Sequence, residues 1–236
     1  MEQPVEYNDY SDTKEAIHPK GSPLWPKHLA ELYIKPTKFF AGQLALHKTP
    51  YLLFVTWCYG ISHSIGRLNK DMFRALMERP TFPGYFGPWT ESWLAYWANV
   101  FVYGIAAALG VWFVGGWWYR VRVRWSGSKN PDIKLARQVY IYASFVHACP
   151  IVLIALISTV LYPSYSTAFA SVSVFSDIIL IFPFWSLVTS YKGVRTLFDV
   201  SKWRARLWFL ILPALVYIIG LGLFGYFFSV LSQQGL

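Results

Sequence analysis

The residues of this sequence best placed to do chemistry are the polar side chains inside its long apolar stretches. Asp177 is the acidic residue that falls within such a stretch, with Ser173 and Ser176 beside it. A carboxylate in hydrocarbon is costly unless it is paired, protonated or hydrated. We therefore expect Asp177 to face the interior of a helical bundle.

Helix geometry limits which side chains can pair with Asp177. At about 1.5 Å per residue, Asp177 lies about 21 Å from the basic end of its helix, His63 lies at nearly the same height, and His147 lies only about 12 Å up its own helix. Asn99 falls toward the same side as Asp177. The predicted intramembrane polar site therefore comprises Asp177, His63, Ser173, Ser176 and Asn99. It is interpreted either as a structural hydrogen-bond cluster or as a substrate or proton site.

Catalytic motifs are missing from the sequence. GxSxG, HExxH, CxxC, Walker A and dinucleotide-binding GxGxxG patterns do not occur. His63 and His147, predicted at different heights, do not form a haem ligand pair. Cys58 and Cys149 both lie in apolar runs and indicate no disulfide framework. We predict no enzyme activity, no catalytic residue, no cofactor and no metal.

The elements that position these residues are predicted to be transmembrane helices. Hydrophobic residues make up 55% of the chain and charged residues 14%, against about 25% charged in soluble domains. Because lipid offers no partner to backbone amides, each long apolar run should be a helix. The fold class is thus an all-α, polytopic bundle of five spans with an N-terminal amphipathic helix. The predicted spans are residues 50–66, 93–119, 139–162, 168–191 and 207–231.

The segments outside the spans complete the predicted organisation. Residues 1–26 form an acidic, proline-containing flexible tail, and residues 232–236 form a short C-terminal tail. Residues 27–49 alternate apolar and lysine side chains, which predicts an interfacial amphipathic helix, broken at Pro36. Residues 50–231 form the five-span domain.

The formal charge of +9 is concentrated between the apolar runs. Six cations precede the first span, then four, six, none and five occupy successive loops, and none follows the last span. The positive-inside rule places the N terminus in the cytoplasm and the C terminus outside. No basic stripe interleaved with aromatics indicates nucleic-acid binding. The predicted contacts for anionic lipid headgroups or a cytoplasmic partner are Arg120, Arg122, Arg124, Arg195, Lys202 and Arg204.

Three phrases of the sequence resemble the Yip1 domain family in its bacterial form. They are ELYIKPTKFFAGQL at 31–44, ARQVYIYASFVHACPIVL at 136–153 and FPFWSLVTSYKGVRTLFDVSKWRARLWFLILP at 182–213. The matching residues are Tyr140, Tyr142, Ala143, Ser144 and Pro150 in the second phrase, and Trp185, Ser186, Gly193, Val194 and Arg195 in the third.

The resemblance implies a five-span, non-enzymatic protein of a bacterial inner membrane. Eukaryotic members are associated with vesicle traffic and small GTPases and carry a D-L-Y-G-P phrase before the first span. Here the nearest phrase, GYFGP at 84–88, follows the first span. The resemblance therefore does not carry GTPase binding to this chain.

Two functions remain open from the sequence. The first is a scaffold or accessory subunit that works through membrane lipids and other membrane proteins, within a multi-subunit complex. The second is a small transporter or channel component that uses Asp177 and His63 as its intramembrane site.

Overall fold

The computed structural model describes residues 24, 26–43, 49–77, 92–171 and 181–233. All regular secondary structure within these residues is helical, as the sequence predicts. Helices are the expected outcome because a chain of this apolar content must satisfy its backbone amides within each segment.

The amphipathic N-terminal region forms two short helices, α1 (Pro26–Ile34) and α2 (Pro36–Gln43). The break falls at the predicted proline, which begins α2 at a position where its missing N–H costs nothing. The apolar side chains of this region are buried in the protein: Leu32, Phe39 and Phe40 have no exposed surface. The ring of Phe39 lies 5.4 Å from that of Tyr142, centroid to centroid. These two helices are thus packed onto the bundle.

Helices α3 (Thr49–Met77) and α5 (Trp93–Gly110) approach each other through glycines. A Cβ built on Gly60 of α3 would lie 2.1 Å from the carbonyl oxygen of Gly104 of α5. Helix α3 also continues past the predicted boundary at Gly66. It does so because Leu68 and Met72 pack against the apolar cluster beneath them, so the helix extends beyond its most hydrophobic stretch.

Helix α5 continues through one π-helical turn, η1 (Val111–Gly115), into α6 (Gly116–Trp125). A loop containing Gly127 then leads to α7 (Ile133–Leu161). Gly127 has a φ of 113°, a conformation that favours glycine. Asp132 caps α7 by accepting a 3.0 Å hydrogen bond from the Lys134 backbone amide.

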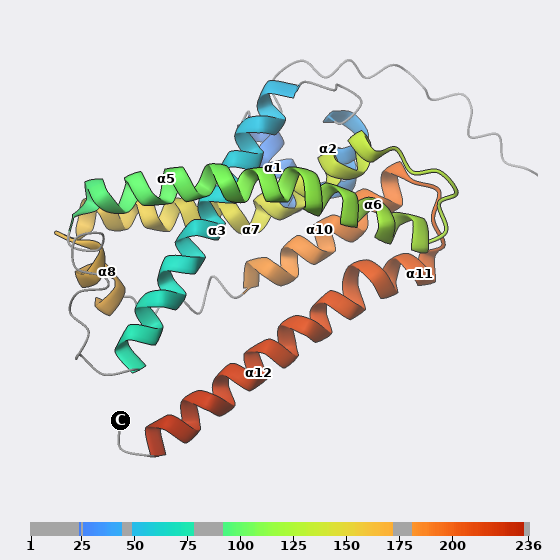
Figure 1. The fold of residues 1–236 in the computed structure, drawn as a ribbon. Helices are drawn as coiled ribbons and strands as arrows, with labels where there is room; N and C mark the ends of the chain where they lie inside the picture. The colour runs from blue at the N-terminus through green and yellow to red at the C-terminus, as the bar shows by residue number, and fades with distance from the viewer. Residues whose placement is uncertain (1–23, 25, 44–48, 78–91, 172–180, 234–236) are drawn as a thin grey trace, which may run out of the picture.

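Helix α7 is the centre of the molecule and packs against α3, α6 and α10. Its buried face runs from Ala136 to Ala148 and includes Val139, Ile141 and Val146, which are fully buried. Figure 1 shows α7 lying behind α5 with α3 crossing both. The predicted span at residues 139–162 therefore contributes much of the core of the bundle.

The C-terminal third contains α8 (Tyr165–Ser171), α10 (Ile181–Leu197) and one long helix made of α11 (Lys202–Arg206), η2 (Leu207–Ile211, a π turn) and α12 (Leu212–Gln233). Helix α12 runs apart from the other helices in Figure 1, and its apolar side chains are largely exposed, Val216 at 69% and Ile219 at 59%. This exposure suits a surface that faces lipid.

Three helical segments of the described chain are long and apolar enough to cross a membrane. They are Trp93–Trp125, Ile133–Leu161 and Lys202–Leu223. The first two extend several residues past the predicted spans on the side rich in arginine and lysine. Basic residues assigned from the sequence to loops, such as Arg122 and Arg204, therefore lie on helices.

The two ends of the bundle differ in chemistry. At the basic end, defined as the region where α6 and α10 end and α7 and α11 begin, cations gather. At the opposite, aromatic end, Tyr165 of α8 stacks on Tyr96 of α5 with 4.4 Å between ring centroids. There the Trp93 indole also donates a 2.8 Å hydrogen bond to the Tyr162 carbonyl.

Candidate functional site

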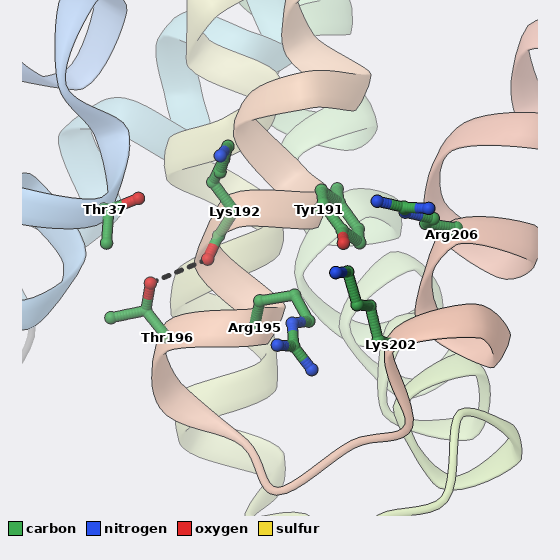
Figure 2. A pocket seen from close by; sticks show the side chains of 7 residues that line it. All are labelled: Thr37, Tyr191, Lys192, Arg195, Thr196, Lys202 and Arg206. Carbon is green, nitrogen blue, oxygen red and sulfur yellow. Dashed lines mark hydrogen bonds between the residues drawn. The ribbon is translucent and has the colours of Figure 1, made fainter.

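A basic pocket opens at the basic end, between α2, α10 and α11. Its volume is about 430 Å³. Figure 2 shows Thr37 of α2 on one side, α10 in the middle, and Lys202 and Arg206 reaching from α11 toward Tyr191. The residues that line it are Thr37, Tyr191, Lys192, Arg195, Thr196, Lys202 and Arg206.

The helices place these side chains by their ordinary spacing. Lys192, Arg195 and Thr196 occupy one face of the last turns of α10, since residues three and four apart are neighbours on a helix. Lys202 and Arg206 are four residues apart on α11, and so share a face by the same rule. Arg204, halfway between them, points elsewhere and does not line the pocket.

The loop between α10 and α11 is fixed by hydrogen bonds. The Ser201 amide donates to the Ser126 carbonyl at 2.9 Å, which ties this loop to the one after α6. Arg195 Nη1 donates to the Val200 carbonyl at 3.2 Å, which leaves other N–H groups of its fork available to a ligand. The Thr196 hydroxyl donates to the Lys192 carbonyl at 2.8 Å, and its oxygen can still accept a hydrogen bond.

The pocket carries a concentrated positive charge. Lys192, Arg195, Lys202 and Arg206 are all exposed, and among the described residues none of them has a carboxylate within salt-bridge distance. Lys38 of α2, by contrast, is paired with Glu31 at 2.8 Å, and this hydrogen bond holds the pKa of the Glu31 carboxyl below its usual value. The pocket therefore offers four uncompensated cations to an anion.

Two of the three arginines of α6, Arg120 and Arg122, form hydrogen bonds within the protein. The Arg122 guanidinium donates to the Trp208 carbonyl of η2 and lies 4.4 Å from the centre of the Phe209 ring. Arg120 Nε donates to the Pro131 carbonyl at 2.9 Å. Arg122 thus fastens η2, and with it α11, to α6. Arg124 is exposed to the surroundings.

Of the six basic residues predicted from the sequence to contact lipid or a partner, Arg195 and Lys202 meet in the pocket, whereas Arg120, Arg122, Arg124 and Arg204 lie outside it. The sequence prediction missed Lys192 and Arg206, although they occur in the same charge clusters. It also missed Thr37, which is far away in the sequence and gives no local signal.

The predicted intramembrane site is only partly covered by the described residues. Asp177, Ser173 and Ser176 lie outside them, so the pairing with His63 stays a prediction. His63 lies on α3 with its ring 4.7 Å from that of Tyr59, and Asn99 is half-buried on α5. His147 is half-buried on α7.

A polar seam that the sequence did not reveal crosses the bundle near the basic end. The Tyr119 hydroxyl of α6 lies 2.8 Å from the Ser190 hydroxyl of α10, and the Tyr119 ring lies 5.6 Å from that of Tyr140 of α7. Tyr140 in turn lies 6.0 Å from Tyr59 of α3. In the described chain, no three His, Cys, Asp or Glu side chains come together as a metal site requires.

This architecture is that of a helical, multi-pass membrane protein with a basic end. The Yip1 domain matches residues 30–224, and the chain belongs to the Yip1 domain family. Members of that family are generally non-catalytic proteins of membrane traffic. The comparisons with curated proteins and with solved structures gave no match.

Proposed function

We propose that this protein is a non-catalytic scaffold or accessory subunit of a bacterial inner membrane, which acts through lipids and protein partners bound at its basic end. The basic pocket carries the proposal. Its four cations form no salt bridge within the described residues, and this arrangement favours binding of an anion over acid–base chemistry. Membership of a generally non-enzymatic family agrees with it.

The proposed topology has five spans. Helix α3 and the predicted span at residues 168–191, which overlaps α10 and lies partly outside the described residues, add two crossings to the three segments that qualify by length and hydropathy. Helix α3 has 29 residues, which extend about 43 Å at 1.5 Å per residue and suffice to cross a bilayer. The basic end then faces the cytoplasm by the positive-inside rule, with the C terminus outside.

Labelling of single cysteines tests this topology. In a background of Cys58→Ser and Cys149→Ser, Ser128→Cys marks the basic end and Ser164→Cys marks the aromatic end. A membrane-impermeant maleimide should label Ser164→Cys in intact cells, and Ser128→Cys only after the membrane is opened. The reverse order would invert the proposed orientation.

The scaffold role is tested by purification of the tagged full chain in mild detergent. Mass spectrometry and a mass measurement of the particle should show a second protein at fixed stoichiometry. A homogeneous particle that contains this chain alone would contradict the accessory-subunit role.

A further inference from the structure

The geometry points to a specific ligand for the basic pocket: we propose that it binds the phosphate monoester headgroup of an anionic membrane lipid. The inference deepens the proposed function and rests on it, because the pocket must lie at the level of the cytoplasmic headgroups. It replaces a diffuse attraction between basic loops and lipid by one site with defined residues.

The charge of the pocket and the placement of its cations favour a phosphate monoester. Lys192 and Arg195 come from α10, and Lys202 and Arg206 from α11, so cations enclose the pocket from two helices. A phosphate monoester carries about −1.5 to −2 charges near neutral pH and offers three acceptor oxygens. An arginine fork can bind two of those oxygens at once. A singly charged phosphodiester would leave more of the four cations uncompensated.

The size of the pocket and the hydroxyl groups on its wall favour a phosphate that is attached to glycerol. A volume of about 430 Å³ lies within the range of small-molecule sites, about 300 to 1,000 Å³. A bare phosphate would fill only part of it, whereas a phosphate with its glycerol backbone fills more. Thr37 and Tyr191 stand on the wall of the pocket and can hydrogen-bond to glycerol or ester oxygens.

The surroundings of the pocket identify the ligand as a lipid. Along α10 and α12, away from the pocket, the exposed side chains become apolar: Val188 is 37% exposed, Leu212 37% and Leu215 48%. Figure 1 shows α12 separating from the bundle beyond α11. A headgroup in the pocket can therefore place its acyl chains along these surfaces. An acidic protein segment has no acyl chains with which to cover these apolar surfaces.

The test measures binding of a soluble, short-chain lipid to the full-length protein in uncharged detergent. Dihexanoyl phosphatidic acid should bind more tightly than dihexanoyl phosphatidylglycerol, and dihexanoyl phosphatidylcholine should bind least. The pocket variant replaces Lys192, Arg195, Lys202 and Arg206 by Gln. The matched control replaces the exposed cations Arg124, Lys129, Lys134 and Arg204 by Gln, which removes the same charge at the same end.

We expect the pocket variant to lose affinity for phosphatidic acid by about tenfold or more, and the control variant by less than about threefold. The difference is expected because direct contacts with the phosphate contribute more to binding than long-range attraction does. Equal losses in both variants would overturn the site in favour of diffuse attraction. Inorganic phosphate or glycerol 3-phosphate binding as tightly as phosphatidic acid would overturn the lipid assignment. An acidic peptide that binds the pocket when phosphatidic acid does not would overturn it as well.

A second variant separates loss of the site from loss of the fold. Thr37→Trp fills the pocket from α2 without a change of charge and should weaken phosphatidic acid binding to a similar degree. Thr37 is exposed, so the folded bundle should tolerate the larger side chain, as a thermal unfolding scan would show. Retained binding in Thr37→Trp would contradict the pocket. If the protein is a scaffold, the pocket variant should still co-purify with its protein partner even where the lipid site is wrong. The lipid proposal can therefore fail while the scaffold proposal holds.

Discussion

Arginines and glycines occur in two regions of this molecule and have different roles in each. In the packed bundle of α3, α5, α6 and α7, Arg122 is bonded to a backbone carbonyl and Gly60 lets two backbones touch. At the edge formed by α11, η2 and α12, Arg206 lines an open pocket and Gly222 meets nothing within 4 Å. The same residue types build the fold in one region and are left available in the other. Residue type alone therefore does not assign a role here.

The largest effect should follow substitution of Gly60. In Gly60→Ala the new Cβ meets the Gly104 carbonyl oxygen at 2.1 Å, and because that oxygen belongs to a helix backbone, the helices must separate. We expect a loss of about 3 kcal/mol in the free energy of unfolding, measured by thermal unfolding in detergent. Gly66→Ala on the same helix is the control, since nothing lies within 4 Å of it. Equal stability of the two variants would refute the close contact.

Arg122→Leu should give the next largest loss. The substitution leaves the Trp208 carbonyl without its donor and removes the cation over the Phe209 ring. A loss of about 2 kcal/mol is expected, as for other hydrogen bonds to charged groups. Arg124→Leu, two residues away and exposed, should change stability little. If both variants behaved alike, Arg122 would belong with the available cations of the edge.

The surface pair of Glu31 and Lys38 should contribute only weakly. Since the folded-state pKa of Glu31 is lowered, its contribution is present above the unfolded pKa and is lost as the pH falls below about 4.5. Glu31→Gln should cost no more than about 1 kcal/mol at neutral pH, and the difference from the unsubstituted protein should vanish in acid. A difference that persists at a pH below both the folded-state and the unfolded-state pKa of Glu31 would show that the ion pair is not its source.

Gly222→Ala should have the smallest effect on the isolated chain. Nothing in the described structure lies within 4 Å of the added methyl group, and alanine favours a helix over glycine by about 1 kcal/mol at most. Unfolding should therefore shift slightly upward or not at all. A marked drop in recovery of the partner protein, with unfolding unchanged, would instead show that another helix uses this surface.

Sequence reasoning located the helices well because lipid leaves the backbone no other solution. It made several helices too short, because it ended two of them at Gly66 and Tyr191 and began the last one at Leu207, and hydropathy marks only where the hydrocarbon stops. The helices of the structure continue to Met77 and Leu197, and the last one begins at Lys202. Packing of side chains such as Leu68 sustains them past that point.

The candidate site was less accessible to sequence reasoning. Charge counts found the basic end and included Arg195 and Lys202, but they treated Arg122 as equivalent to them. Only the fold shows that the Trp208 carbonyl satisfies Arg122, or that Thr37 completes the pocket from α2. Long-range contacts of this kind leave no periodic pattern in a single sequence.

The two π turns, η1 and η2, have a consequence for how relatives of this chain should be compared. Each π turn holds about one residue more than an α turn, so the helix beyond it presents a face rotated by about 100°. In η2 this rotation lies between the basic residues of α11 and the apolar face of α12. A relative that lacks the π turn should align with this chain only through a one-residue gap within residues 207–211. Such a gap in the middle of an apolar helix would mark a position where family members differ in which face of the helix is turned toward lipid.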